Sequence, residues 1–317
     1  MDFVPDTAIS DVDGKNNRII VRGHLLENLT ANYTYERMCG LLWKGSLVTT
    51  LLGEARVRAA SRIPRGTGLK GVLSTIDEED PAYATAAVAV AVAREANAKA
   101  PQPDPVADHA ADFLRMATGA ADPARAAALE TYLVAMAENG LNTSTYVARI
   151  VASTGATMGA AMSAAYGALE GPLHGGAPGK VLEMLDAVGE PSNAANWVGR
   201  ERAAGRRIPG MGHRIFTGLD PRASILENAA AKLPSARFLP VARAVKEAAN
   251  MRRDKPLFAN VELYTAVLLD AVGLPKSLFT PAFAVARVAG WCAHIAEQRA
   301  NGKLIQPNAR YIGPSPS

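Results

Sequence analysis

The stretch Gly171-Pro172-Leu173-His174-Gly175-Gly176-Ala177 sets one histidine in a glycine-rich turn, directly after a run of small residues from 153 to 169. Glycine lets a backbone turn tightly or approach a ligand closely, and it leaves a neighbouring imidazole uncovered. A single histidine in such a turn is more often structural than catalytic. The run before it is rich in Ala, Gly and Ser, which permits helices to pack closely around a buried site.

A second loop has the same character. It reads Pro209-Gly210-Met211-Gly212-His213-Arg214 and is followed by Asp220-Pro221-Arg222. The chain has only five histidines, and two of them occupy glycine loops beside apolar helices. The two loops together therefore indicate a site more strongly than either does alone.

The composition favours an all-α fold. Hydrophobic residues make up 49% of the 317 residues, aromatic residues only 6%, and alanine is abundant, whereas a β-sandwich would need more β-branched and aromatic side chains. The length allows two domains, or one domain with a sizeable lobe. We expect one small β-hairpin near the N-terminus, with a strand at 17–21 and a turn at Asp13-Gly14.

Charge and cysteine content exclude several classes of protein. The net charge of +4 is too small to predict nucleic-acid binding, although Arg200, Arg202, Arg206 and Arg207 gather just before the second loop. The two cysteines suit neither a disulfide framework nor a metal site. The start has no basic and apolar signal-peptide pattern, and the most apolar run, 82–92, is too short for a membrane span. We expect a cytoplasmic protein without a metal.

Helix starts and ends can be read from turn residues. Apolar spacing predicts a helix from Thr34 to Gly45 and another, or a broken pair, over 47–60. Proline after a capping residue predicts starts at Asp80-Pro81, Asp122-Pro123, Asp220-Pro221 and Thr280-Pro281. Thr143 or Ser144 would cap the next helix, and further helices are expected at 106–118, 157–169, 179–188, 259–272 and 283–299.

The chemically capable residues form a small inventory. Two loop histidines, the acid Glu262 near a helix start, and Arg222 and Arg287 suit proton abstraction beside a carbonyl followed by carbon–carbon bond formation. Each also has a structural explanation. Glu262 could satisfy a helix dipole, the arginines could be ion-pair partners, and His24 and His294 are more often core or surface residues. The glycine loops match neither a P-loop nor a dinucleotide fingerprint.

The chain resembles the citrate synthase family. The resemblance rests on the two histidine loops above, on Asn260-Val261-Glu262, and on three further stretches. These are Leu278-Phe279-Thr280-Pro281, Ala286-Arg287-Val288-Ala289-Gly290-Trp291 and the tail Ala309-Arg310-Tyr311-Ile312-Gly313. The motifs cover nearly the whole chain in order, and as a set they are very specific.

The resemblance implies an all-helical homodimer. Residues 1–177 with 276–317 would form a large domain, and 178–275 a small domain that closes over the cleft. The family joins an acyl-CoA to a 2-oxo acid such as oxaloacetate and then hydrolyses the thioester, with no bound cofactor.

The resemblance also implies roles for individual residues. His174 would stabilise the enol of the acyl group with Ser144 orienting it, His213 would polarise the acceptor carbonyl, and Glu262 would stand at the position of the general base. Arg222 and Arg287 would bind acceptor carboxylates, and Phe283 would line the acyl pocket. The residues that would hold the CoA adenine are Arg207, Ile208, Gly210 and Met211.

Three positions depart from the family pattern. The family's aspartate base is Glu262, whose carboxylate reaches one methylene further. A family histidine that contacts the acceptor is Asn139, which can hydrogen-bond but carries no charge. The first arginine of the family's Arg-Pro-Arg tail is Gln306, followed by Pro307-Asn308, although Arg310 is close in sequence.

These departures lead to three hypotheses. The first is a citrate synthase-like acyltransferase whose acceptor is not oxaloacetate. The second is a lyase that cleaves a citryl-CoA-like thioester. The third is a protein that binds CoA but has lost turnover, and the retention of His174, His213, Arg222 and Arg287 argues against it.

Overall fold

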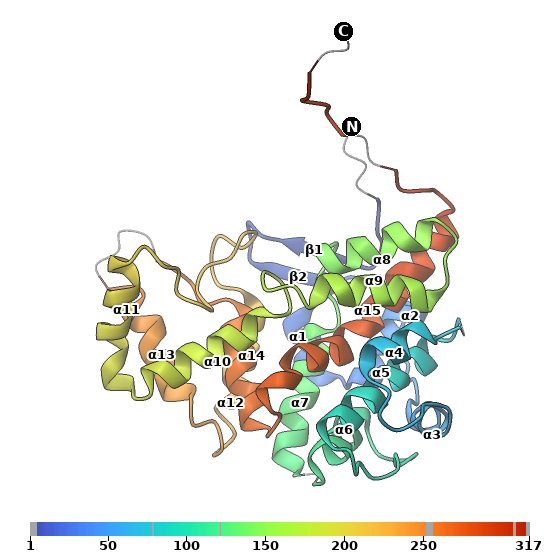
Figure 1. Ribbon diagram of the computed structural model, residues 1–317, viewed down its shortest axis with the longest axis horizontal. Coiled ribbons are helices and arrows are strands. Elements are labelled where there is room, and N and C mark those ends of the chain that lie inside the picture. The colour runs from blue at the N-terminus through green and yellow to red at the C-terminus, as the bar shows by residue number, and fades with distance from the viewer. Residues whose placement is uncertain (1–4, 78, 121, 252–255, 307–308, 315–317) are drawn as a thin grey trace.

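The computed structural model describes residues 5–77, 79–120, 122–251, 256–306 and 309–314. Over these residues the fold is almost entirely helical, which confirms the all-α prediction (Figure 1). The helices of the first half are α1 (Leu26–Asn32), α2 (Tyr35–Lys44), α3 (Gly53–Arg62), α4 (Leu69–Ser74), α5 (Pro81–Ala96), α6 (His109–Thr118), α7 (Pro123–Met136) and α8 (Thr143–Ser153). Those of the second half are α9 (Met158–Leu169), α10 (Ala177–Val188), α11 (Ala194–Ala203), α12 (Pro221–Ala230), α13 (Leu239–Ala248), α14 (Val261–Ala271) and α15 (Phe279–Asn301), with 3₁₀ turns at Pro191–Asn193 and Lys276–Leu278.

Capping residues begin several helices where the sequence predicts. The side chains of Asp80, Asp122 and Asp220 each accept a backbone hydrogen bond at the start of α5, α7 and α12, and a proline follows each of them. Thr34 caps α2 in the same way, and Gly45 ends that helix in the left-handed region at φ 69°.

Four predicted boundaries are wrong. The helix expected over 106–118 begins only at His109. Residues 47–52 are not helical, because this segment crosses α2 so closely that a β-carbon on Gly40 would collide with the Val48 carbonyl. Asn142, rather than Thr143 or Ser144, caps α8 by accepting a hydrogen bond from Thr145 N. Helix α15 starts at Phe279, so Pro281 lies within its first turn, where a missing N–H costs little.

The expected N-terminal hairpin is present. β1 (Ser10–Asp13) pairs antiparallel with β2 (Arg18–Val21), which also pairs with the two-residue strand β3 (His24–Leu25). Residues 14–17 form the turn between β1 and β2. Ile19 and Val21 are fully buried, so one face of β2 anchors the hairpin on the helices.

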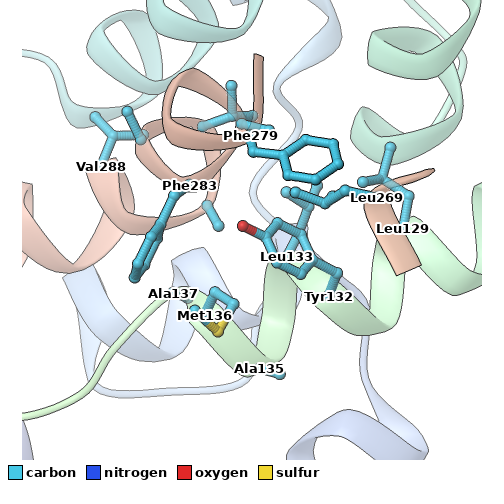
Figure 2. Packing of buried hydrophobic residues seen from close by; sticks show 14 of the residues in the cluster. Leu129, Tyr132, Leu133, Ala135, Met136, Ala137, Leu269, Phe279, Phe283 and Val288 are labelled. Carbon is cyan, nitrogen blue, oxygen red and sulfur yellow. The ribbon is translucent and has the colours of Figure 1, made fainter. Parts of the chain in front are cut away.

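Helix α15 is the central element of the core. It packs against α2, α5, α7, α8 and α9 (Figure 1). Within the described residues, one helical stretch, Lys276–Asn301, is long and apolar enough to cross a membrane, but 94% of its most apolar window is buried inside the protein. Its apolar character therefore serves the core. Phe279 and Phe283 of α15 meet Tyr132 and Leu133 of α7 in this core (Figure 2).

Helices α10 to α14 lie together on the left of Figure 1. Helix α12 packs on α14 and also on α7, so it connects this group to the core around α15. The loop with His213 is joined to the start of α14, because Asn260 Nδ2 donates to the Gly212 carbonyl. Arg222, at the start of α12, lowers the pKa of both His174 and His213, so both histidine loops lie near the start of α12.

Candidate active site

His174 lies half-buried in the turn between α9 and α10. Its Nε2 is 3.0 Å from Oγ of Ser144, a fully buried residue in the first turn of α8. Ser144 Oγ also accepts a hydrogen bond from Trp291 Nε1 (3.2 Å) and donates one to Asn142 Oδ1 (2.8 Å). A hydroxyl has one proton. When Ser144 donates to Asn142, His174 Nε2 carries the ring proton and donates to Ser144 Oγ. When the hydroxyl instead donates to Nε2, the ring proton lies on Nδ1.

The surroundings of His174 keep its ring neutral. Burial, reinforced by the positive charges of Arg287 and Arg222, lowers its pKa to about 4. The ring also packs edge-on against Phe283, with centroids 6.1 Å apart. A neutral imidazole can donate one hydrogen bond and accept another, which suits the stabilisation of an enol.

Arg287 is a fully buried cation on α15. Its Nε donates to the Met136 carbonyl (2.7 Å), whereas Nη1 and Nη2 have no hydrogen-bond partner among the described residues. Burial is the main reason that its pKa is lowered to about 10. The guanidinium stacks on Phe283 at 4.9 Å from the ring centroid. Two unpaired, parallel N–H groups of this kind fit a carboxylate.

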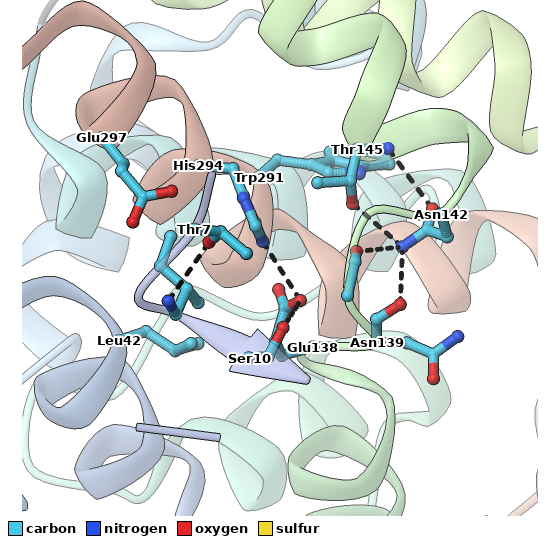
Figure 3. A network of polar contacts seen from close by, with 12 residues as sticks. Thr7, Ser10, Leu42, Glu138, Asn139, Asn142, Thr145, Trp291, His294 and Glu297 are labelled. Atoms are coloured by element: carbon cyan, nitrogen blue, oxygen red, sulfur yellow. Dashed lines mark hydrogen bonds and ion pairs between the residues drawn. The ribbon is translucent and has the colours of Figure 1, made fainter. Parts of the chain in front are cut away.

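Asn139 lies in the same segment as the Met136 carbonyl. It is half-buried, and its Oδ1 has no partner among the described residues. The neighbouring Glu138 is fully buried, and its Oε1 accepts hydrogen bonds from Ser10 Oγ (2.8 Å) and His294 Nε2 (3.1 Å) (Figure 3). Burial alone would raise the pKa of Glu138, but His294 and Arg287 hold it below the ordinary value. Glu138 thereby fixes the segment that presents Asn139.

His213 is held by its own loop. Its Nδ1 accepts hydrogen bonds from Ile215 N and Phe216 N, both at 3.0 Å. The ring proton must therefore sit on Nε2, which is free to donate. Burial lowers the pKa of His213, and Arg222 lowers it further against the opposing effect of Asp220. His213 is thus a neutral hydrogen-bond donor.

Glu262 lies in the first turn of α14, and Asn260 caps this helix by accepting from Glu262 N (3.1 Å). Asn260 Nδ2 also donates to the Gly212 carbonyl (2.8 Å), which ties the start of α14 to the loop with His213. Glu262 Oε2 is buried without a partner among the described residues. Burial raises the pKa of this carboxyl group. A carboxylate with a raised pKa is a stronger base than an exposed one.

Arg222 lies at the centre of the charged cluster. It is almost fully buried in the first turn of α12, and its charge affects the pKa of His174, His213, Glu262 and Arg287. Its guanidinium is already engaged by Asp220, with Nε to Oδ1 at 3.1 Å and Nη2 to Oδ2 at 2.9 Å. Arg222 therefore has fewer free donors for a ligand than Arg287.

The expected CoA-binding residues follow α11. Arg207 is exposed, Ile208 and Gly210 are buried, and Met211 is half-buried and bridges to Ala259. Gly210 has φ 77°, and a β-carbon there would lie 2.9 Å from the Leu263 side chain. Two arginines of the basic cluster are engaged within the protein, because Arg206 pairs with Glu201 and Arg202 donates to the Ala249 carbonyl.

The tail residues do not join this cluster. Gln306 and Arg310 are exposed, and residues 309–314 lie away from the helices (Figure 1). Pro307 and Asn308 lie outside the described residues. Across the described residues, no group of three or more His, Cys, Asp and Glu side chains could hold a metal ion.

Sequence reasoning missed three residues of the site. The sequence predicts no role for Trp291 and no cap at Asn142, and it predicts Asp220 only as a helix cap. An asparagine before a Thr-Ser-Thr run is a signal that could have identified Asn142. The contact of Trp291 with Ser144 spans 147 residues, and no local pattern contains it.

Comparison with known proteins gives one consistent result. The family model "Citrate synthase, C-terminal domain" matches residues 71–308. A Mycobacterium tuberculosis protein named "Putative citrate synthase 2" is 38% identical over 65% of this chain and 56% of its own length, so that match spans little more than half of the relative. The 2-methylcitrate synthase of the same species is 31% identical over 98% of this chain and 88% of its own length. The crystal structure of citrate synthase from Thermotoga maritima superposes with a TM-score of 0.86 at 30% identity, over 99% of this chain and 95% of that one.

Proposed function

The chain belongs to the citrate synthase family, and on this premise we propose that it joins an acyl-CoA to a 2-oxo acid and then hydrolyses the thioester. The observation that carries the proposal is the single cluster of His174, His213, Glu262, Arg222 and Arg287 around one region. Within it, the two unpaired N–H groups of Arg287 and the unpaired Glu262 oxygen lack partners that a substrate can supply.

The first step is removal of a proton from the acyl α-carbon. Glu262 takes this proton, and its raised pKa strengthens it as a base. Ser144 turns its hydroxyl proton toward His174 Nε2, so that Nδ1–H donates to the thioester oxygen as the enol forms. Trp291 keeps the Ser144 oxygen in place by donating to it.

The second step forms the carbon–carbon bond. The enol carbon attacks the 2-oxo carbon of the acceptor while His213 Nε2–H hydrogen-bonds to the carbonyl oxygen, which gains negative charge. The enol oxygen gives up its proton as the thioester carbonyl re-forms, and the proton removed from the acyl α-carbon balances the new hydroxyl group, so that His213 stays neutral. Water then cleaves the thioester, which releases the CoA thiol and a new carboxylate. His213 suits this role because its Nδ1 is already occupied by two backbone donors.

We propose that the acceptor is not oxaloacetate but a 2-oxo acid with fewer carboxylates or a larger side chain. Arg287 would bind one carboxylate through Nη1 and Nη2. Arg222 is paired with Asp220, and Asn139 and Gln306 stand where the family has charged side chains. The cluster therefore offers less positive charge to a second carboxylate.

The remaining proposals follow from family membership. Arg207, Ile208, Gly210 and Met211 would hold the CoA adenine, and Phe283, already packed on His174, would line the acyl pocket. Residues 178–275 would close as a small domain over the large one. The enzyme would be a cytoplasmic homodimer that needs no metal or bound cofactor, with Arg310 of one subunit near the site of the other.

Release of free CoA thiol tests the proposal. Purified protein is mixed with acetyl-CoA or propionyl-CoA and a panel of 2-oxo acids that includes oxaloacetate, with His174→Ala as control. We expect release that depends on His174 and is fastest with an acceptor other than oxaloacetate. Fastest turnover with oxaloacetate would contradict the proposed acceptor. Cleavage of a citryl-CoA-like thioester without condensation would instead identify the lyase.

Exchange of the acyl-CoA α-protons with deuterated water tests the first step separately. We expect Glu262→Gln to slow this exchange by about 10²- to 10⁴-fold, because it removes the base. Glu262→Asp withdraws the carboxylate by one methylene and should slow the exchange by about 10- to 100-fold. Exchange in the wild type should rise with pH through the raised pKa of Glu262. Binding of acyl-CoA without any exchange would show that the protein is an inactive binder.

A further inference from the structure

The tip of the N-terminal hairpin contacts the loop that carries His213. Asn17 Oδ1 accepts a hydrogen bond from Gly218 N (2.8 Å), and the Gly14 carbonyl accepts from both Thr217 N and Thr217 Oγ1 (3.3 Å each). These partners are about 200 residues apart in the chain. We refer to Gly14 and Asn17 with residues 215–218 as the hairpin clamp.

The two sides of the clamp approach too closely for ordinary side chains. A β-carbon on Gly218 would lie 2.6 Å from Asn17 Nδ2, and one on Gly14 would collide with the Ile215 carbonyl. Neither glycine has a positive φ, so the requirement is for space and not for backbone freedom. Asn17 itself has φ 52°, a left-handed conformation that asparagine tolerates better than most residues. The residue with this left-handed backbone is also the one whose side chain accepts the hydrogen bond from Gly218 N.

The clamp acts on the residues that fix the His213 ring. Ile215, which touches Gly14, donates its N–H to His213 Nδ1, and so does the next residue, Phe216. Phe216 is buried and packs against the imidazole with centroids 4.7 Å apart. A shift of this loop would therefore change both the proton position and the direction of Nε2.

The rest of the protein holds this loop at two other points. Gly212 is hydrogen-bonded to Phe258 and Asn260, next to α14, and the Phe216 side chain is buried in the core. A groove of about 740 Å³ is lined by residues of α1 and α12 and by Asn17 and Leu219, so space remains beside the clamp. The contacts of Gly14 and Asn17 hold the part of the loop between Ile215 and Gly218.

We propose that Asn17 is a positioning residue for His213, and that the hairpin clamp holds this histidine in the Nε2–H form aimed at the acceptor. The proposal rests on the proposed function, in which His213 polarises the acceptor carbonyl. Asn17 acts through the 213–218 loop and touches no substrate.

Asn17→Gly separates positioning from folding. Glycine adopts φ 52° at no steric cost, so the turn should form as well as in the wild type, or better. The hydrogen bond to Gly218 is lost. We expect an unchanged or higher melting temperature, faster amide exchange over residues 213–218, and an Nδ1–H population of His213 in the ¹⁵N-histidine NMR spectrum. The His213 signal is assigned with His213→Gln.

Kinetics provide a second measurement. Condensation in Asn17→Gly should fall about 10- to 100-fold in kcat, because a misplacement of about 1 Å can cost 100-fold. Acyl α-proton exchange, which uses His174 and Glu262, should not change. Asn17→Asp retains an acceptor oxygen and should restore both the NMR signal and kcat. The control is Asn16→Ala, which removes only the hydrogen bond from Asn16 Nδ2 to Asp13 Oδ2 within the same turn and should behave as wild type.

A double-mutant cycle tests the contact itself. Gly218→Ala should disturb the loop, because its β-carbon meets Asn17. When it is combined with Asn17→Gly, the double variant should show little further loss of kcat and little further change in the His213 NMR signals. Additive effects would overturn the proposal, and so would wild-type His213 signals and amide exchange in Asn17→Gly. These signals are measured without turnover. A wild type that is inactive with every acceptor would therefore refute the proposed function, whereas the NMR and amide-exchange results would still test the hairpin clamp.

Discussion

At the scale of single residues, two buried arginines differ in how far the protein itself satisfies their hydrogen bonds. Arg56 and Arg287 are both fully buried. Arg56 is matched by Asp112 (2.8 Å) and by the carbonyls of Asp104 and Ala107, whereas both Nη atoms of Arg287 lack partners among the described residues. Burying an unpaired cation is costly. The missing hydrogen bonds of the Arg287 Nη groups are therefore unfavourable for folding, even though its charge faces Glu138, and they are expected of a group that binds an anionic ligand.

Replacing Arg287 should separate stability from binding. We expect Arg287→Met to melt close to the wild-type temperature, because it removes two buried N–H groups that lack hydrogen bonds but also a positive charge that stabilises buried Glu138. Millimolar 2-oxo acids should raise the melting temperature of the wild type and not that of the variant. The matched variant Arg56→Met removes the guanidinium that faces Asp112 and leaves the carbonyls of Asp104 and Ala107 without this donor, while Arg115 and Asp104 N still bind Asp112. It should lose about 1–3 kcal/mol of unfolding free energy. An Arg287→Met protein that melts much lower, or that still responds to 2-oxo acids, would contradict this assignment.

His174 should impose its own pH dependence on stability. Its pKa in the folded protein is about 4, below the ordinary 6.5. Between these values the unfolded chain binds a proton that the folded chain does not, so the free energy of unfolding rises with pH across this window and levels off above it. His174→Gln should have a smaller slope from pH 4 to 6.5. Urea midpoints over this range measure it, with the exposed His24→Gln as control. Equal slopes for His174→Gln and wild type would refute the neutral, buried histidine.

At the scale of elements, local sequence predicts helix starts well and distant contacts poorly. Asp-Pro pairs place the starts of α5, α7 and α12 because capping depends on residues within one turn. The segment at 47–52 escaped prediction because its conformation depends on a close crossing of α2. The candidate site shows the same contrast between features predicted from local sequence and contacts between distant residues. Loop glycines and the family resemblance indicated His174 and His213, but the contacts of Trp291 with Ser144 and of Asn17 with Gly218 exist only in the folded chain.

Helix α15 offers a test of such a crossing. A β-carbon on Gly290 would collide with the Ala137 carbonyl and Glu138 Oε2, in the segment that presents Asn139. We expect Gly290→Ala to lower the unfolding free energy by about 1–3 kcal/mol through overpacking, despite the better helix propensity of alanine. Gly199→Ala in α11, where a β-carbon meets nothing within 4 Å, should instead be neutral or stabilising. Chemical denaturation measures both, and a stabilised Gly290→Ala would show that the crossing is looser than described.

At the scale of the whole molecule, one surface remains unexplained in a single chain. Helices α8 and α9 lie side by side along the top of Figure 1. Their sequences contain one charged residue, Arg149, and it is buried and paired with Glu297. The outer positions of α8 are Tyr146, Val147, Ile150 and Val151, and those of α9 are the small residues Ser163, Ala164, Gly167 and Ala168, all exposed or half-exposed. An uncharged, largely apolar face of this kind is typical of a subunit interface.

This face predicts where the proposed homodimer forms. Small residues on α9 allow two copies of the helix to approach closely. The apolar residues of α8 in each subunit would then be buried against the other subunit. Ile150→Glu buries an unpaired charge in that interface and should give a folded monomer in sedimentation equilibrium, with condensation reduced because Arg310 would no longer reach the neighbouring site. Val106→Glu replaces a valine that is 90% exposed elsewhere on the surface and should remain dimeric. A dimer that survives Ile150→Glu would mean that this face is not the interface. A monomeric wild type that is active would mean that each site is complete within one chain.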